Sequence, residues 1–138
     1  MGSLVDLHVD DAVEPSTVAE GTEVQVRIVT GSLEVSTNNN EYLLAILEVP
    51  TEPTAKDFRH MMMLPDDEAS EKRQNSSKWR IKEFLQAFGF GTDSIDPDSW
   101  AGATAWCTLR ETESGDYGKQ NSIRKFLATG GGAPQSGQ

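Results

Sequence analysis

The sequence contains almost no cysteine and no long apolar run. Cys107 is the only cysteine in 138 residues, so the chain cannot form an internal disulfide or a cysteine-built metal site. No apolar stretch approaches the ~20 residues that a membrane-spanning helix needs. The acidic opening residues lack the basic and apolar regions of a secretory signal. We therefore expect a cytoplasmic protein without a membrane partner.

Motifs for catalysis and cofactor binding are also missing. His8 and His60 have no serine, cysteine or histidine neighbour in a catalytic pattern, and the sequence has no phosphate-loop, dinucleotide-binding or zinc-protease motif. Cys107 lies on the small apolar side of an expected strand, where a free cysteine acts as a small hydrophobic side chain. The acidic loop at 93–98 lacks the spacing of a calcium-binding loop. We expect no enzyme activity, cofactor or metal site.

Charge is distributed unevenly along the chain. The formal net charge is −10, from 22 acidic and 12 basic residues. Residues 1–55 carry ten acids and one base, whereas residues 56–138 carry twelve acids and eleven bases. A polyanion responds to the local field rather than to the total charge. The second part of the chain therefore remains compatible with nucleic-acid binding.

Composition divides the chain into one domain and two tails. Residues 1–21 are rich in acids and predict a flexible acidic arm, and residues 129–138 (TGGGAPQSGQ) predict a disordered tail. Residues 22–128 between them have the size of one small domain.

Periodicity within this domain predicts five strands and one helix. Alternating apolar and polar residues predict strands over 24–35, 42–49, 57–64, 103–113 and 121–128. The acids at 66–68, after Pro65, predict a helix start, and Ile81, Phe84, Leu85 and Phe88 form its apolar stripe. A helix between the third and fourth of five strands is the order of the OB-fold, a Greek-key barrel. We expect a mainly β protein of this class, with the helix stripe closing one end of the barrel.

Basic and aromatic residues cluster where an OB-fold binds single strands. Lys56 and Arg59 flank Phe58 in the third strand, and four basic residues bracket the last hairpin, which has Tyr117 at its tip: Arg110, Lys119, Arg124 and Lys125. Single-strand binders combine such basic groups with aromatic side chains that stack on bases.

Two tryptophans leave alternatives open. Trp106 shares a strand face with Thr108 and Arg110, and either stacks on a base or packs beneath the N-terminal arm. Trp79 lies almost opposite the helix stripe, where exposure would imply a partner. Burial by an irregular helix start is the alternative that we favour.

Segments of the sequence resemble a known group of proteins. The runs EYLLAILEVP, DFRHMMMLPDDE, KWRIKEFLQAFGF, ATAWCTLRE and NSIRKFLA are similar to the single-stranded-DNA-binding proteins of tailed bacteriophages, over about residues 22–128. The resemblance implies an OB-fold that coats single-stranded DNA without reading its sequence, in the host-cell cytoplasm, during phage replication or recombination. It implies DNA contacts by Tyr42, Phe58, Arg59, Trp106, Arg110, Tyr117, Lys119, Arg124 and Lys125. Such proteins often end in an acidic tail, whereas the acids here lie at the N-terminus.

We therefore predict sequence-independent binding and protection of single-stranded DNA. The acidic arm would compete with DNA or recruit replication and recombination proteins. The alternative is an OB-like module for protein–protein interaction or virion assembly that does not bind nucleic acid. The sequence leaves the oligomeric state open, a homo-oligomer included.

Overall fold

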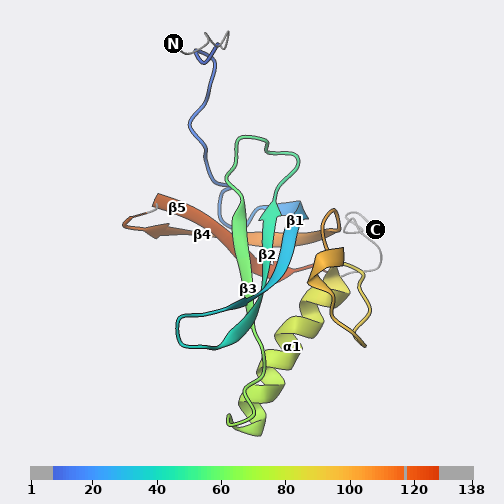
Figure 1. Cartoon of the computed structure of the whole chain (residues 1–138). Helices are drawn as coiled ribbons and strands as arrows, with labels where there is room; N and C mark the ends of the chain where they lie inside the picture. The colour runs from blue at the N-terminus through green and yellow to red at the C-terminus, as the bar shows by residue number, and fades with distance from the viewer. Residues whose placement is uncertain (1–7, 117, 128–138) are drawn as a thin grey trace, which may run out of the picture.

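One antiparallel sheet and one α-helix form most of the protein (Figure 1). The computed structural model describes residues 8–116 and 118–127. The strands are β1 (Glu23–Val35), β2 (Glu41–Glu48), β3 (Phe58–Met63), β4 (Thr104–Ser114) and β5 (Gly118–Phe126). Helix α1 (Glu71–Ala87) and the short 3-10 helix η1 (Pro97–Ser99) lie between β3 and β4 in the chain. The mainly β class and the five strands agree with the sequence prediction.

Strand β1 joins the two halves of the sheet. Its first residues pair with β4, its later residues pair with β2, and the β2 register shifts between Ile28 and Thr30. The strand order is β3-β2-β1-β4-β5, so β3 and β5 are the two edge strands. These edges approach one another, but no backbone ladder joins them within the described residues. The described residues therefore form an open sheet, and the OB-fold barrel that the sequence predicted stays a prediction.

Helix α1 starts later than the sequence predicted. The acids at 66–68 form a turn in which Asp66 Oδ1 accepts a hydrogen bond from the backbone N–H of Glu68 at 3.0 Å. Ser70 is the N-cap, and its hydroxyl accepts from the N–H of Arg73. Aspartate side chains compete for backbone donors and favour turns, whereas serine is a strong cap. The N-terminal half of α1 extends beyond the sheet (Figure 1).

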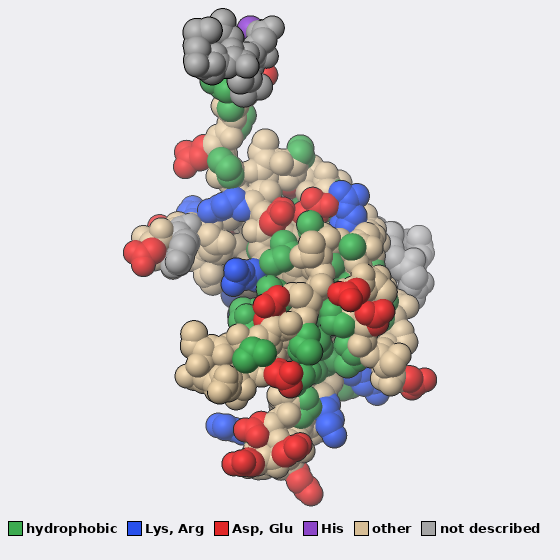
Figure 2. Space-filling view, viewed as in Figure 1, with side chains coloured by type: hydrophobic (Ala, Val, Ile, Leu, Met, Phe, Trp, Pro, Cys, Tyr) green, Lys and Arg blue, Asp and Glu red, His purple; other side chains and the backbone are tan. Residues whose placement is uncertain are grey.

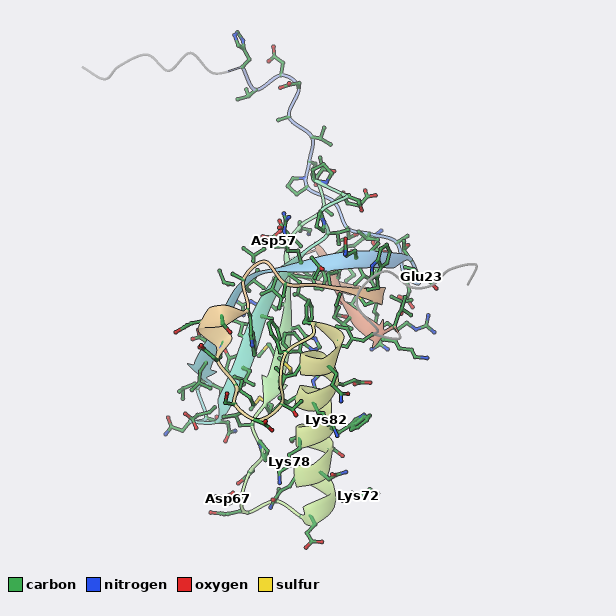
Figure 3. The ribbon with its side chains drawn as sticks, turned by 90° about the vertical axis from the view of Figure 1, so that its right-hand side faces the viewer. Glu23, Asp57, Asp67, Lys72, Lys78 and Lys82 are labelled. Carbon is green, nitrogen blue, oxygen red and sulfur yellow. The ribbon has the colours of Figure 1, made fainter. Side chains whose placement is uncertain are left out.

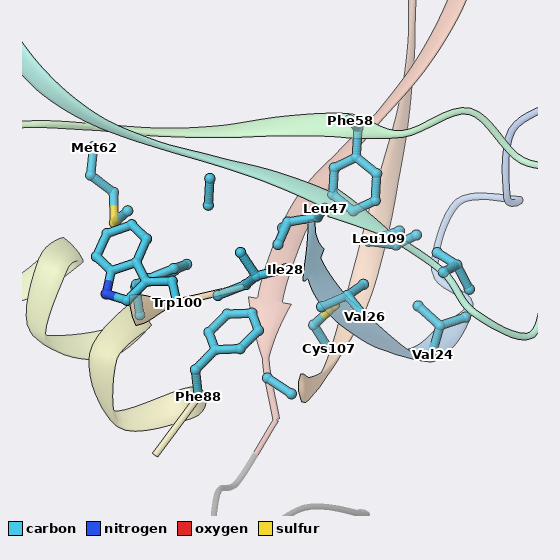
Figure 4. Packing of buried hydrophobic residues seen from close by; sticks show 14 of the residues in the cluster. Val24, Val26, Ile28, Leu47, Phe58, Met62, Phe88, Trp100, Cys107 and Leu109 are labelled. Atoms are coloured by element: carbon cyan, nitrogen blue, oxygen red, sulfur yellow. The ribbon is translucent and has the colours of Figure 1, made fainter. Parts of the chain in front are cut away.

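The core lies between the inner face of the sheet and the C-terminal half of α1. The predicted stripe of Ile81, Phe84, Leu85 and Phe88 is buried. Trp100, 1% exposed, packs against Phe84 at a ring-centroid distance of 4.8 Å. Figure 4 shows the core continuing from Trp100, Met62 and Phe88 past Ile28 to Val24 and Leu109.

The end of the expected N-terminal arm is attached to the sheet. Ser16 forms a parallel bridge with Ala55, and Val18 is buried. The Asn121 side chain accepts from the N–H of Val18 at 2.8 Å and donates to its carbonyl oxygen at 2.8 Å. Residues 1–7 and the expected tail at 129–138 lie outside the described residues.

Candidate nucleic-acid interface

The outer face of β2 and β3 combines apolar side chains with one guanidinium. Tyr42, Leu44 and Ile46 point away from the core and are half-buried. Their cross-strand partners on β3 are Met63, Met61 and Arg59, all exposed. A strand sends alternate residues to opposite faces, so these six residues form one continuous patch.

The outer face of β4 and β5 has a more basic character. Trp106, Thr108 and Arg110 lie on the same side of β4. Thr108 pairs with Lys125 and Arg110 pairs with Ser122. Lys119 lies on the opposite face, because it pairs with Glu113, which shares the face of the buried Leu109.

Two hollows lie between β3 and β5, along a line that we call the β3–β5 seam. The larger, about 420 Å³, is lined by Ile46, Asp57, Phe58, Arg59, Gln120 and Asn121. The smaller, about 100 Å³, also reaches α1 and is lined by His60, Arg80, Glu83, Ile123, Arg124, Lys125 and Phe126. The seam thus brings together residues from the third strand, the helix and the last strand.

The seam has a local excess of positive charge. Four basic and two acidic side chains line it, so its net charge is +2 in a chain of net charge −10. The basic residues are Arg59, Arg80, Arg124 and Lys125, and the acidic ones are Asp57 and Glu83. In Figure 2, Lys and Arg side chains lie beside β3 and near β4 and β5, next to apolar side chains. A polyanion would meet favourable potential here.

Arg80 is held at the edge of β3. Its Nε and Nη2 donate to the carbonyl oxygen of Met61 at 3.2 and 3.0 Å. As β3 is an edge strand, this guanidinium covers an otherwise unpaired stretch of backbone. Unlike Arg80, the lysines of α1 do not line the seam. Lys72, Lys78 and Lys82 are spread along the length of the helix (Figure 3).

His60 lies behind the smaller hollow in an uncharged form. It is 5% exposed, stacks on Phe84 at 5.5 Å and meets the edge of Phe126 at 5.6 Å. Burial, and secondly the positive charge of Arg80, lower the pKa of His60 to about 3. Its Nε2 has no hydrogen-bond partner within the described residues.

Most of the residues assigned by resemblance lie on the outer surface, with two exceptions. Phe58 is wrong as a stacking residue, because it is 3% exposed and its ring belongs to the core. Tyr117 lies outside the described residues. Tyr42 and Trp106 are half-buried, and the indole Nε1 of Trp106 is buried without a partner in the described residues. The remaining five are exposed, namely Arg59, Arg110, Lys119, Arg124 and Lys125.

Sequence reasoning missed two helix residues. Arg80 reaches the seam, although its position within a run of helix charges resembled an ordinary solvated face. Trp79 is 54% exposed, so the favoured expectation of burial was wrong. The ammonium of Lys82 lies 5.9 Å from the centroid of the Trp79 ring, which is the distance of a cation–π contact.

Side chains of the types that bind metal ions, and the free cysteine, also lie within the described residues. Residues 8–116 and 118–127 contain no group of three or more His, Cys, Asp or Glu side chains placed to hold a metal ion. Burial raises the pKa of the Cys107 thiol to about 12, so the nucleophilic thiolate does not form near neutral pH. Within the same part of the chain, no helix is long and apolar enough to cross a membrane.

Comparison with known proteins gives no family assignment. No family model matches the chain, and no curated protein sequence matches it significantly.

Proposed function

We propose that this chain binds single-stranded DNA without sequence preference and protects it. The positive seam carries the proposal, because a +2 region stands out in a chain of charge −10. Basic side chains at the seam would contact phosphates and release counterions. The apolar patch on β2 and β3 and the half-buried Trp106 would pack against the bases.

An OB-type barrel is the fold that we propose for this function. Two observations support it: β1 pairs with both β2 and β4, and the edges of β3 and β5 approach each other. In such barrels the face that includes the second and third strands binds single strands. The seam and the patch on β2 and β3 belong to that face.

A hollow at the other end of the sheet suits a polyanion poorly. It measures about 480 Å³ and lies between the start of β2 and the loop before α1. Four acidic side chains and one arginine line it: Glu41, Asp66, Asp67, Glu68 and Arg73. The negative charge would repel phosphate groups, so the DNA path avoids this end of the sheet.

The biological setting rests on the resemblance to phage proteins. We propose a role in phage DNA replication or recombination, in the host-cell cytoplasm. The acidic arm, with Asp10, Asp11 and Glu14, would compete with DNA or recruit replication and recombination proteins.

The test is a titration with a dT oligonucleotide at low and at high salt, with a duplex of equal length as the control. Tryptophan fluorescence provides the signal, because Trp79 is exposed and Trp106 is half-buried. We expect quenching by dT that weakens with salt, and little response to duplex. Arg59→Gln should weaken binding, whereas Lys72→Gln, on the part of α1 far from the sheet, should not (Figure 3). No dT binding by fluorescence and by gel shift would refute the function.

A protein-interaction or virion assembly module is the second candidate. The exposed side chains of Leu33 and Val35 on β1 favour it, because exposed apolar groups mark contact surfaces. The double variant Arg110→Ala/Lys125→Ala separates the two functions. Loss of oligonucleotide binding supports the first candidate, and loss of a protein partner alone supports the second.

A further inference from the structure

The smaller hollow of the seam has the features of an anion site. It lies where β3, α1 and β5 come together, and three of its lining residues are basic: Arg80, Arg124 and Lys125. Glu83 is the single acidic residue that lines it. The lining charge is therefore +2 within a volume of about 100 Å³.

The basic side chains of this hollow remain available to a ligand. Within residues 8–116 and 118–127, no acid lies within ion-pair distance of Arg124 or Lys125. Arg80 uses its Nε and Nη2 on the carbonyl oxygen of Met61, which fixes the guanidinium at the hollow. A guanidinium held in this way loses little side-chain entropy when it binds a phosphate oxygen.

The interior of the hollow is polar as well. His60 lines it and is buried, and its Nε2 has no partner in the described part of the chain. A buried polar atom without a partner is costly, and most such atoms in proteins are satisfied by protein, water or ligand. Nε2 itself is closed to solvent, so other atoms of His60 line the hollow.

We propose that this hollow is a phosphate subsite, in which Arg80, Arg124 and Lys125 hold one phosphodiester group of the bound strand. The inference rests on the proposed single-strand binding. It assigns the point at which the protein holds the sugar-phosphate backbone of the DNA strand. At about 30 Å³ for each water molecule, the hollow has room for at least three waters, and a phosphate group fits in comparable space. Free inorganic phosphate has the same charge and oxygen acceptors as a phosphodiester group. The experiment therefore includes both ligands, a dT oligonucleotide and inorganic phosphate.

The experiment compares the wild type with Arg124→Gln/Lys125→Gln and with the control Lys72→Gln. Affinity for a dT oligonucleotide is measured over a range of salt concentrations. For single strands, the slope of log affinity against log salt changes by about 0.7 for each phosphate contact. The double variant should bind roughly tenfold more weakly at low salt, with a slope shallower by about 0.7, while Lys72→Gln should match the wild type. Equal thermal midpoints would show that the exposed substitutions leave the fold intact.

The results distinguish failure of the phosphate subsite from failure of the proposed function. If the wild type binds dT and the double variant binds with unchanged affinity and slope, the subsite is refuted and the proposed function stands. If the wild type does not bind dT, both fail. Inorganic phosphate is then titrated alone, with the His60 ring resonances followed by NMR. Shifts in the wild type that the double variant lacks, without any DNA binding, would assign the hollow to free phosphate and overturn the phosphodiester proposal.

Discussion

Gly31 allows Trp100 to pack against β1, and substituting it tests this packing directly. A Cβ atom at position 31 would lie 2.5 Å from Trp100 Cε3 and 2.6 Å from the carbonyl oxygen of Pro97. Carbon atoms in contact are normally separated by about 3.5 Å, so Trp100 would have to move by about 1 Å. The ring is 1% exposed and lies 4.8 Å from Phe84 and 6.1 Å from Phe90, so it has little room to move.

The expected loss of stability follows from this geometry. Overpacking of a filled core costs about 3 kcal/mol at the upper end of the usual range. Replacing glycine by alanine restricts the unfolded chain, which offsets about 1 kcal/mol. Gly31→Ala should therefore lower the free energy of unfolding by about 2 kcal/mol and the melting temperature by roughly 8 °C.

The assay is urea and thermal denaturation followed by far-UV circular dichroism, which follows mainly the backbone structure. Gly91→Ala is the matched control, because a Cβ there meets nothing within 4 Å and the backbone φ lies outside the left-handed region. We expect the control to unfold at or slightly above the wild-type midpoint. A Gly31→Ala midpoint equal to that of the control would refute the close approach of Trp100 to β1.

Three further predictions concern the attached N-terminal segment, the buried histidine and the acidic arm. Asn121→Ala removes both hydrogen bonds to Val18 and should reduce the free energy of unfolding by about 2 kcal/mol, measured by urea denaturation. Asn75→Ala on exposed helix surface is its control, and equal midpoints for the two variants would contradict the role of Asn121. The pKa of His60 is about 3 in the folded state, against an ordinary value of 6.5, so the unfolded chain takes up the proton first and stability falls as the pH drops from 6.5 toward 3. Between pH 7 and pH 5, the wild type should lose about 2 kcal/mol more than His60→Phe in denaturation experiments, and parallel losses would show that His60 is not held neutral. Deleting residues 1–14 should raise the affinity for dT at low salt, and unchanged affinity would exclude the arm as a competitor.

Periodicity predicted the five strands well, because the alternation of apolar and polar residues can be read from neighbouring positions. The face of a strand is harder to predict when both sides are apolar. Met61, Met62 and Met63 follow one another, so both faces of β3 carry apolar side chains, and Arg59 is the charged residue that marks the outer face. The flanking basic residues and the resemblance predicted Phe58 on the DNA-binding face, whereas its register with β2 and its burial place it in the core.

The helix boundary and the seam depended on information that local patterns do not contain. Acids after a proline and a serine cap are both helix-start signals, and the geometry of the Asp66 turn decided between them. The seam forms from strands that are distant in sequence and not paired with each other. Periodicity along one segment could not show that Arg80 and Arg124 line the same hollow.

The hydrogen bonds between Val18 and Asn121 also bear on how the chain folds. They connect residues 103 positions apart, and the backbone of Gly21 likewise donates to Leu109 in β4. Such non-local contacts form slowly, because a long loop must close before they stabilise anything. Domains emerge from the ribosome N-terminus first, so the Val18 backbone lacks its Asn121 partner until β5 has been made, although Ser16 can pair with Ala55 earlier. A chain truncated before Asn121 would lack both hydrogen bonds to Val18, and the backbone at Val18 would then be more accessible to proteases.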